Sequence, residues 1–270
     1  MAPLSTRRIA ILGAAVFACV PGLEAQETVS ITAEPGTVVR WAAPGTERCE
    51  AGQRSWLPHG DDCYFPVDLN RTEDMPISRL RNGQRDRALV TIEGYPYPVE
   101  EVTVPESYVS LSSEDLERSR RERRRIDALW SLDGERLFEI PLLPPLASRP
   151  TARNFGSRRV FNGEPRSPHT GADYSATPGT PVRAVADGSV AMAEEHFFGG
   201  KTVFLNHGAG LISMSMHLSR ILVEKGDRVS AGQVIGEVGS TGRVSGPHLH
   251  FGFRWRGARI DPSVLIGSRP

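Results

Sequence analysis

The chain has 270 residues, of which 32 are basic and 32 are acidic, so its formal net charge is zero. This balance argues against a dedicated nucleic-acid-binding protein, because no basic field covers the whole chain. The length exceeds that of one small domain, and we therefore expect two domains.

The first 25 residues have the layout of a secretory signal peptide. Arg7 and Arg8 precede an uncharged apolar run at residues 9–20, which is too short to span a bilayer as a helix, and a small residue stands at Ala25. We expect export to the periplasm or cell wall, with no stable membrane insertion after residues 1–25 are removed. A twin-arginine signal is an alternative, and so is a lipoprotein anchor on Cys19, although Phe17 fits a lipobox poorly.

Two cysteines, Cys49 and Cys63, remain once Cys19 leaves with the signal. An even pair in an oxidising compartment predicts a disulfide. Such a bridge would close a loop of roughly fifteen residues and contribute about 3 kcal/mol of stability in the chain-entropy account. The alternative, a metal site that includes His59, lacks a fourth convincing ligand.

Residues 26–110 predict a small N-terminal β-sandwich-like domain. Strand-like runs at residues 29–32, 37–41, 88–93 and 99–104 are separated by Pro, Gly, Asn and Asp turn signals. No catalytic constellation is visible among them. We expect this domain to position the protein, to hold it to a surface, or to cover its site.

A helix and a proline-rich linker are predicted over residues 111–150. Ser112 or Ser113 would form the N-cap, with acidic residues in the first turn. The arginine run at residues 120–125 suggests either polyanion binding or, more ordinarily, a solvated face with acidic partners. Its apolar stripe comprises Leu116, Ile126, Leu129 and Trp130, and the linker contains Pro141, Pro144, Pro145 and Pro150.

Residues 151–270 are rich in glycine and predict a second domain that is nearly all β. Strand-like runs occur at residues 182–186, 188–193, 202–206 and 211–216, with shorter pieces around Val229, Val234 and His248. Asp187-Gly188 predicts a hairpin turn between two of these runs. His207 precedes Gly208 at a turn and is expected to be structural.

Alternation along residues 211–217 divides the side chains between two faces of a strand. Ile212, Met214 and Met216 share one face, which leaves Ser213, Ser215 and His217 on the other. His217 is therefore expected to open onto the polar side of its sheet, with a purely structural histidine as the alternative.

His248 and His250 are separated by one residue, Leu249, in a stretch, residues 247–255, that predicts a buried strand. Residues two apart on a strand point to the same face, with Cα atoms about 7 Å apart. One imidazole could bind a metal while the other contacts the molecule bound to that metal. Such a pair can also simply hydrogen-bond to its neighbours. Leu249, Phe251 and Phe253 would face a core.

His169 and Asp173 form a second cluster upstream of this pair. Two imidazoles and one carboxylate are ordinary zinc ligands, and they leave a tetrahedral site one position short, as a catalytic metal requires. An iron oxygenase uses a similar ligand set. Extracytoplasmic placement and two additional histidines fit zinc hydrolysis better.

Six short motifs follow in order between residues 154 and 266, and together they resemble the lysostaphin-type, LytM-like zinc endopeptidases of bacterial cell walls. The motifs stand at residues 162–169, 179–182, 217–219, 226–229, 232–236 and 242–251. The resemblance implies a mainly β, duplicated-hybrid-motif fold for residues 151–270 and a peptidoglycan peptide as substrate. It implies one Zn²⁺ per chain on His169, Asp173 and His250, with His217 and His248 as the catalytic histidines that do not bind the metal.

One position departs from the family pattern. The family commonly carries a tyrosine two residues before the histidine that matches His217, and this chain has Ser215 there. By the alternation above Ser215 would face the cleft, so the departure puts groove shape and rate in doubt. All five metal and proton-transfer positions are nevertheless present.

Other functional classes fit this sequence less well. A catalytically weak or inactive wall-binding regulator of other hydrolases is the main alternative, but such proteins typically lose zinc ligands and none is lost here. A biotinyl or lipoyl carrier is suggested by residues 226–236, yet no lysine stands where one would be modified. His196, with Phe197 and Phe198 in the same loop, could line a substrate groove.

Overall fold

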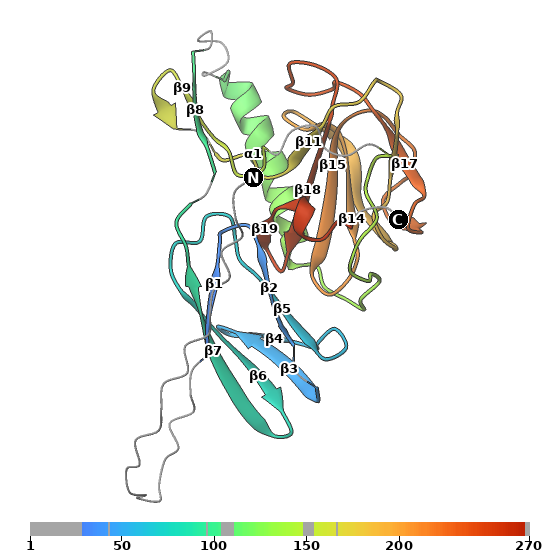
Figure 1. The fold of residues 1–270 in the computed structure, drawn as a ribbon. Helices are drawn as coiled ribbons and strands as arrows, with labels where there is room; N and C mark the ends of the chain where they lie inside the picture. Colours follow the sequence, from blue (N-terminus) through green and yellow to red (C-terminus); the bar gives the residue numbers. More distant parts are fainter. Residues whose placement is uncertain are drawn as a thin grey trace, which may run out of the picture.

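The computed structural model describes residues 29–42, 44–95, 97–103, 111–147, 154–165 and 167–267 (Figure 1). The predicted signal peptide, Cys19 and Pro150 of the predicted linker lie outside these residues. The described fold is mainly β, as the sequence predicts, with one α-helix among the described residues. No helix in these ranges is both long enough and apolar enough to cross a bilayer.

The N-terminal strands build two layers around one apolar core. A five-stranded sheet in the order β1-β7-β6-β3-β4 packs against the β2-β5 pair, and their shared core includes Val39, Phe65 and Val90. The predicted runs at residues 29–32, 37–41 and 88–93 coincide with β1, β2 and β7. The strands are β1 (Val29–Ala33), β2 (Val38–Ala42), β3 (Thr46–Ala51), β4 (Arg54–Trp56), β5 (Asp62–Pro66), β6 (Met75–Arg81) and β7 (Gln84–Ile92).

A disulfide joins the two N-terminal layers. Cys49 on β3 is bonded to Cys63 on β5 across a sequence separation of 14, and both residues are fully buried. The predicted bridge is thus confirmed, and the alternative metal site with His59 is not formed. The His59 Nε2 atom instead lies 2.6 Å from the carboxylate of Glu139.

The predicted run at residues 99–104 does not join the N-terminal sheets. Its strand, β8 (Val99–Val102), pairs in parallel with β9 (Arg158–Phe161), which in turn pairs with β10 (Glu164–Pro165). These three strands form a separate small sheet at the far end of the molecule from β3 and β4 (Figure 1). Sequence alternation cannot reveal this, because the partner strand lies more than fifty residues away.

The large sheet contains most of the C-terminal strands. The order β11-β18-β15-β14-β13-β16 forms its main path, while β12 and β17 pair with each other and β19 pairs with β18. The strands are β11 (Ala172–Tyr174), β12 (Pro181–Arg183), β13 (Gly188–His196), β14 (Gly200–Asn206), β15 (Leu211–Ile221), β16 (Arg228–Val229), β17 (Val234–Val238), β18 (Leu249–Trp255) and β19 (Ala258–Ile260).

The hairpin predicted at Asp187-Gly188 is wrong. Strand β12 ends at Arg183 and pairs with β17, whereas β13 begins at Gly188 and pairs with β14 and β16. Asp187 lies in the connection between β12 and β13, where it contacts two distant segments. Its carbonyl lies 2.7 Å from the His207 ring, and its carboxylate accepts from the Ala231 N–H. Long-range partners therefore override the local turn preference of the dipeptide.

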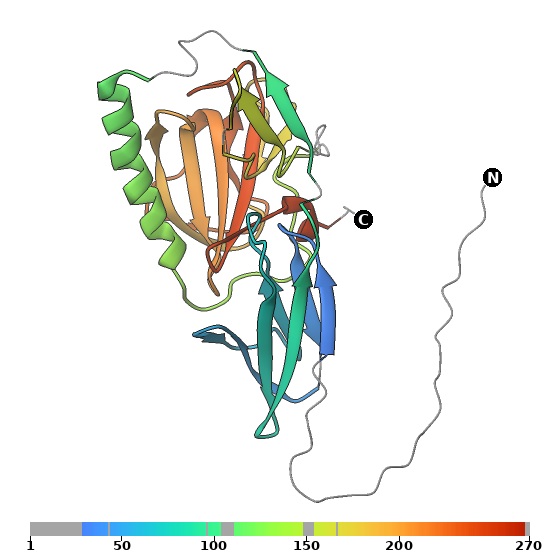
Figure 2. The same ribbon diagram turned by 90° about the vertical axis from the view of Figure 1, so that its left-hand side faces the viewer.

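The large sheet buries both of its faces. Leu249, Phe251 and Phe253 of β18 lie in the main core, as their alternation predicts. The opposite face carries Phe204, Ile212 and Met214, which pack against the segment that includes η2 (Ala128–Ser131). Figure 2 shows α1 (Ser113–Asp127) running along this face.

Helix α1 begins and packs largely as its sequence predicts. Ser112 is the N-cap, and its hydroxyl accepts from the Asp115 N–H. Leu129 is buried at the end of the helical segment, with Ile126 and Trp130 packed against the same cluster, but Leu116 is 37% exposed and lies outside it. Three members of the arginine run have acidic partners: Arg121 pairs with Glu117, Arg123 with Asp127 and Arg125 with Glu194, and Arg118 just before the run pairs with Glu122.

An ion pair links the N-terminal region to the large sheet. The carboxylate of Asp68, which follows β5, accepts hydrogen bonds from the backbone N–H and the guanidinium of Arg259 on β19. The Leu69 N–H also donates to the Arg259 carbonyl at 3.1 Å. The last short helix, η3 (Pro262–Val264), follows this contact.

Candidate metal centre

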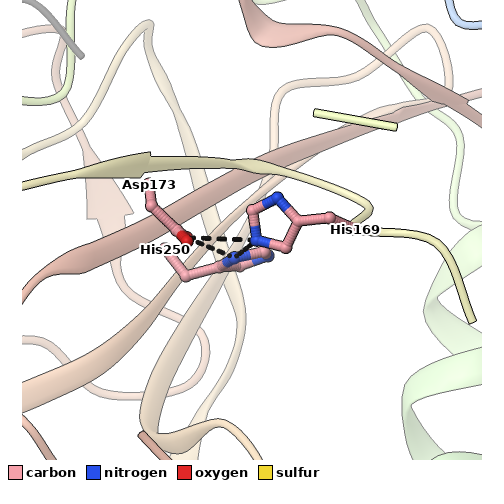
Figure 3. A group of neighbouring side chains, drawn as sticks. All are labelled: His169, Asp173 and His250. Carbon is pink, nitrogen blue, oxygen red and sulfur yellow. Dashed lines mark hydrogen bonds and ion pairs between the residues drawn. The ribbon is translucent and has the colours of Figure 1, made fainter. Parts of the chain in front are cut away.

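Three side chains converge at one edge of the large sheet. Antiparallel pairing of β11 with β18 puts Asp173 opposite His250, and the loop before β11 brings in His169 (Figure 3). The His169 Nε2 atom lies 2.9 Å from His250 Nδ1 and 3.1 Å from Asp173 Oδ1, and His250 Nδ1 lies 3.0 Å from the same oxygen. Residues that are far apart in sequence thus meet at one point.

Asn154 organises this cluster from outside it. Its side-chain amide donates to Asp173 Oδ2 at 2.8 Å, and its side-chain oxygen accepts from the Asp173 N–H at 3.1 Å. Its backbone carbonyl lies 3.0 Å from His169 Nδ1. Sequence reasoning missed Asn154, because no motif marks it and its role depends on the fold that brings it beside β11.

The three converging atoms fit a divalent cation. A carbonyl can only accept, so His169 must carry its proton on Nδ1 and leave a lone pair on Nε2. That lone pair faces Asp173 Oδ1, another acceptor, and His250 Nδ1, so a single proton on His250 cannot satisfy all three atoms. Two imidazole nitrogens and one carboxylate oxygen are a donor set that zinc prefers, and these atoms all lie within 4.8 Å of one another.

The surroundings keep these groups in the states that bind metal. Burial alone would raise the pKa of Asp173, but its interactions with the rings of His169 and His250 outweigh it and hold that pKa well below its usual range. Burial lowers the pKa of His250, which favours its neutral ring. A carboxylate beside neutral imidazoles is the form in which these groups bind a metal.

Gly171 leaves the space that His250 occupies. A Cβ built on Gly171 would lie 2.5 Å from the Phe251 carbonyl oxygen and 2.6 Å from His250 Nε2. Any larger residue would therefore push against the ring of His250. The glycine between His169 and Asp173 is a packing requirement of the cluster.

His217 reaches the cluster through a β-bulge. Ser215 pairs with Val203 and Leu218 with Lys201, so two residues of β15 stand opposite one residue of β14. His217 adopts the left-handed region with φ of 65°, and its N–H donates to the Gly199 carbonyl at 2.8 Å. Bulges re-aim side chains in this way, and non-glycine residues in this region cost about 1–3 kcal/mol.

The bulge moves His217 to the opposite face of β15 from the one predicted, whereas Ile212, Met214 and Met216 share one face and Ser213 and Ser215 the other, as the alternation predicts. Paired residues of antiparallel strands share a face, and Met216 pairs with His250 while Ser215 pairs with the core residue Phe251. Met216 therefore lies on the face of the site, and Ser215 is only 2% exposed on the opposite face. Ser215 does not line the cleft, contrary to the expectation from the sequence.

His217 and His248 lie together beside the cluster. Their ring centroids are 4.9 Å apart, and the His217 ring is 6.1 Å from that of His250. His248 stands just before β18 and its Nε2 atom lies 3.7 Å from Asp173 Oδ1. The structure therefore brings together all five histidine and aspartate residues that the sequence singled out.

Backbone carbonyls fix the tautomers of both outer rings. His217 Nδ1 lies 3.0 Å from the Thr241 carbonyl, and His248 Nδ1 lies 2.9 Å from the Gly246 carbonyl. Each Nδ1 must therefore donate, which leaves each Nε2 with a lone pair in the neutral ring. Burial lowers the pKa of His217 to about 4, so this ring is neutral at pH 7.

The other histidines are placed differently. His207 is fully buried and contacts the Asp187 carbonyl and the Ser213 hydroxyl, both at 2.7 Å, which confirms a structural role. His196 ends β13, is 4% exposed, and contacts Phe204. It lies under α1 rather than in an exposed loop.

A cavity of about 620 Å³ separates α1 from the site face of the sheet. It reaches Thr170 and Met216, which neighbour His169 and His217 in sequence. Its floor is apolar, with Phe204 and Met214, and His196 and Phe198 also line it. Arginines surround this floor, namely Arg120, Arg123 and Arg124 of the helix and Arg254 of β18.

Residues 167–262 match the family described as "Peptidase family M23". A curated relative from Vibrio cholerae, "Peptidoglycan DD-endopeptidase ShyC", is 39% identical over 138 residues, which cover 50% of this chain and 32% of that protein. A second from the same organism, "Peptidoglycan DD-endopeptidase ShyA", is 44% identical over 109 residues, covering 40% and 25%. The chain thus spans about a third or less of the length of these relatives.

One solved structure is similar over nearly the whole described chain. A putative peptidase M23 from Pseudomonas aeruginosa is 28% identical, with a TM-score of 0.66, and the match covers 87% of this chain and 95% of that one. The likeness therefore extends beyond the large sheet to the N-terminal strands.

Proposed function

We propose that this chain, which carries a domain of the metallopeptidase family M23, is a zinc-dependent endopeptidase that hydrolyses peptide bonds in peptidoglycan stem peptides or cross-links. The observation that carries the proposal is the convergence of His169, Asp173 and His250 beside two imidazoles with free Nε2 lone pairs. The names of the Vibrio cholerae relatives support the substrate class.

His169, Asp173 and His250 would hold the zinc, with Asn154 fixing the orientation of the first two. When bound, the metal polarises the scissile carbonyl and lowers the pKa of water towards about 7. Support from outside the ligand set is typical of such sites, where it keeps each ring in the tautomer that binds.

His217 and His248 would move the proton. Each holds Nδ1 against a backbone carbonyl, and the low pKa of His217 keeps the Nε2 atom of that ring available as an acceptor at neutral pH. A ring that takes the proton of the attacking water becomes a donor, and it can then protonate the leaving amine or stabilise the oxyanion. The 4.9 Å separation of the two rings lets both address one reacting centre.

The cavity beneath α1 would receive part of the peptide. It begins beside the site at Thr170 and Met216, and its arginine rim suits the carboxylates of a stem peptide. Helix α1 would therefore border the substrate groove as well as stabilise the sheet. This gives the segment before the peptidase domain a direct part in substrate selection.

The proposed organisation follows the sequence. A signal peptide at residues 1–25 would direct secretion across the inner membrane, and residues 26–110 would form an N-terminal β domain. Residues 111–150 would connect it to a peptidase domain at 151–270, which contains all five proposed site residues.

The test is digestion of purified cell-wall sacculi by the full chain. We expect muropeptide fragments to be released with zinc and not after chelation, and mass spectrometry of these fragments identifies the bond. A His248→Ala variant is the matched control, because it should retain zinc and release nothing. Release that persists in the chelator, or a zinc-loaded protein that leaves several wall types intact, would contradict the proposal.

A further inference from the structure

A second cavity, of about 530 Å³, lies where the N-terminal strands meet the large sheet. Trp56, His59 and Tyr64 line it from the N-terminal side, and Trp255 and Arg256 line it from the end of β18. Its size is within the range of small-molecule sites, about 300–1,000 Å³. Trp255 stands five residues beyond His250, a distance of about 17 Å along a strand, so this cavity is separate from the metal centre.

Five buried side-chain polar atoms lack a hydrogen-bond partner in the described part of the chain, and three of them belong to residues that line this cavity. These three are Trp56 Nε1, His59 Nδ1 and Arg256 Nη1. Buried polar atoms are nearly always paired, because an unpaired one costs about 1–3 kcal/mol. Three at one cavity indicate a place where a partner is missing.

The three atoms differ in what they require. Trp56 Nε1 and Arg256 Nη1 can only donate. His59 donates through Nε2 to the Glu139 carboxylate at 2.6 Å, so the Nδ1 atom of its neutral ring accepts. A ligand that satisfies all three must offer both acceptors and a donor. Inorganic anions such as sulfate offer acceptors alone, whereas hydroxyl and amide groups offer both.

Aromatic side chains that pack on one another supply part of the cavity wall. Tyr64 stacks on Trp255 with centroids 5.7 Å apart, and Phe138 meets the same indole edge-on. The Arg256 guanidinium lies 4.4 Å from the centroid of Trp56, and burial lowers its pKa to about 10, which leaves it charged. Asp133 and Glu135 add carboxylates at the rim.

From this arrangement we infer that the cavity between the N-terminal strands and the end of β18 is a saccharide-binding site. Flat aromatic rings accommodate the apolar C–H face of a sugar. The hydroxyl and N-acetyl groups at its edge both donate and accept, as the unpaired atoms require. The choice of an N-acetylated glycan rests on the proposed function, because peptidoglycan joins such sugars to the peptides that the metal centre would cut.

The site would hold a glycan strand at a fixed distance from the peptide bond. Binding at this cavity would raise the local concentration of wall peptides near the metal centre. The benefit should therefore appear with intact walls and be absent with sugar-free peptides.

Isothermal titration calorimetry of the full chain with the β-1,4-linked tetrasaccharide of N-acetylglucosamine tests this inference. We expect saturable binding that persists after zinc is removed. Trp56→Phe keeps the ring but deletes the N–H, and Arg256→Gln deletes the charge. Each should weaken binding about ten-fold, the loss expected for one good hydrogen bond. Arg87→Gln, the same change at an exposed arginine of β7, should bind like the wild type.

The outcomes separate this inference from the proposed function. Absence of saturable binding, or equal weakening by the Arg87 control, overturns the saccharide site whatever the protein does to peptides. Zinc-dependent cleavage of a soluble, sugar-free cross-linked peptide should be equal in Trp56→Phe and wild type, while release from sacculi slows in the variant. Failure of the wild type to cut that peptide contradicts the peptidase proposal and leaves sugar binding unaffected. Circular dichroism melting checks that both variants fold.

Discussion

The two ends of strand β18 differ in how their polar atoms are satisfied. At its start, His169, His217 and His248 each place Nδ1 against a backbone carbonyl, and their other nitrogens face one small region. At its end, the indole of Trp56 and the guanidinium of Arg256 contact each other and leave polar atoms unpaired. Hydrogen bonds organise the candidate metal site at one end, and aromatic packing organises the other end. A substitution that disrupts binding at one end should therefore leave binding at the other end unchanged.

Substitution of the site histidines should give the largest effects. His250→Ala removes one of three ligands, and we expect no bound zinc and no cleavage. His248→Ala should keep zinc and lower the cleavage rate about 10²- to 10⁴-fold, because it removes a proton-transfer group only. Metal analysis beside a cleavage assay separates the two. Equal zinc loss in both variants would show that His248 is a ligand.

Gly171→Ala should disturb the same end less severely. The new Cβ presses on the His250 ring and on the Phe251 carbonyl, so we expect zinc affinity to fall about 10- to 100-fold, the range for changes that only disorient a ligand. Competition with a zinc chelator measures the change. Gly94→Ala is the control, because a Cβ there meets nothing within 4 Å. Unchanged affinity would mean that the loop shifts freely.

Removal of the disulfide should affect the other end. The Cys49→Ala/Cys63→Ala variant loses a bridge with a sequence separation of 14, and we expect the free energy of unfolding to fall by about 3 kcal/mol. Because Cys49 pairs with Trp56 across β3 and β4, saccharide binding should weaken as well. Zinc content should not change. Denaturant titration and metal analysis test both statements, and a zinc-free variant would contradict the independence of the two ends.

Asp68→Asn should give the smallest effect, and a pH-dependent one. Burial alone would raise the pKa of Asp68, but hydrogen bonds from Arg259 lower it below its ordinary value of 3.8. Because the pKa is lower in the folded state than in the unfolded state, the charged pair contributes its full stability above the unfolded-state pKa. This stability is lost as the pH falls through the folded-state pKa. We expect Asp68→Asn to cost about 1–2 kcal/mol at pH 7 and progressively less below about pH 4. Thermal melts of both proteins at pH 7 and below about pH 4 test this expectation. A difference in stability between wild type and variant that does not change with pH would contradict it.

The candidate metal centre was predictable because its proposed ligands lie in short, regular sequence contexts. His248 and His250 share a face by strand periodicity alone, and the spacing of His169 and Asp173 suits a loop that leads into a strand. Asn154 and the bulge at His217 were not predictable. Asn154 acts through tertiary contacts, and the bulge arises from a register shift between β14 and β15 that no local pattern records.

The fold was predictable where local signals agreed with distant ones. Strand existence, the disulfide and the N-cap at Ser112 follow from alternation, cysteine parity and capping chemistry. The turn at Asp187 and the partner of β8 did not follow, because each depends on pairing with residues far along the chain. The cavity at Arg256 had no signal in the sequence, since its lining residues come from four separate segments.

The position of α1 and η2 has a consequence for dissecting this protein. Leu129 of η2 covers Phe204, Ile212 and Met214, and Ile126 and Trp130 extend that cover. A fragment that begins at Asn154 would contain every proposed catalytic residue but would leave this apolar surface open to water. Exposed patches of that kind drive self-association. The smallest fragment that behaves as a monodisperse protein should therefore begin before Ser112, ahead of the family M23 match.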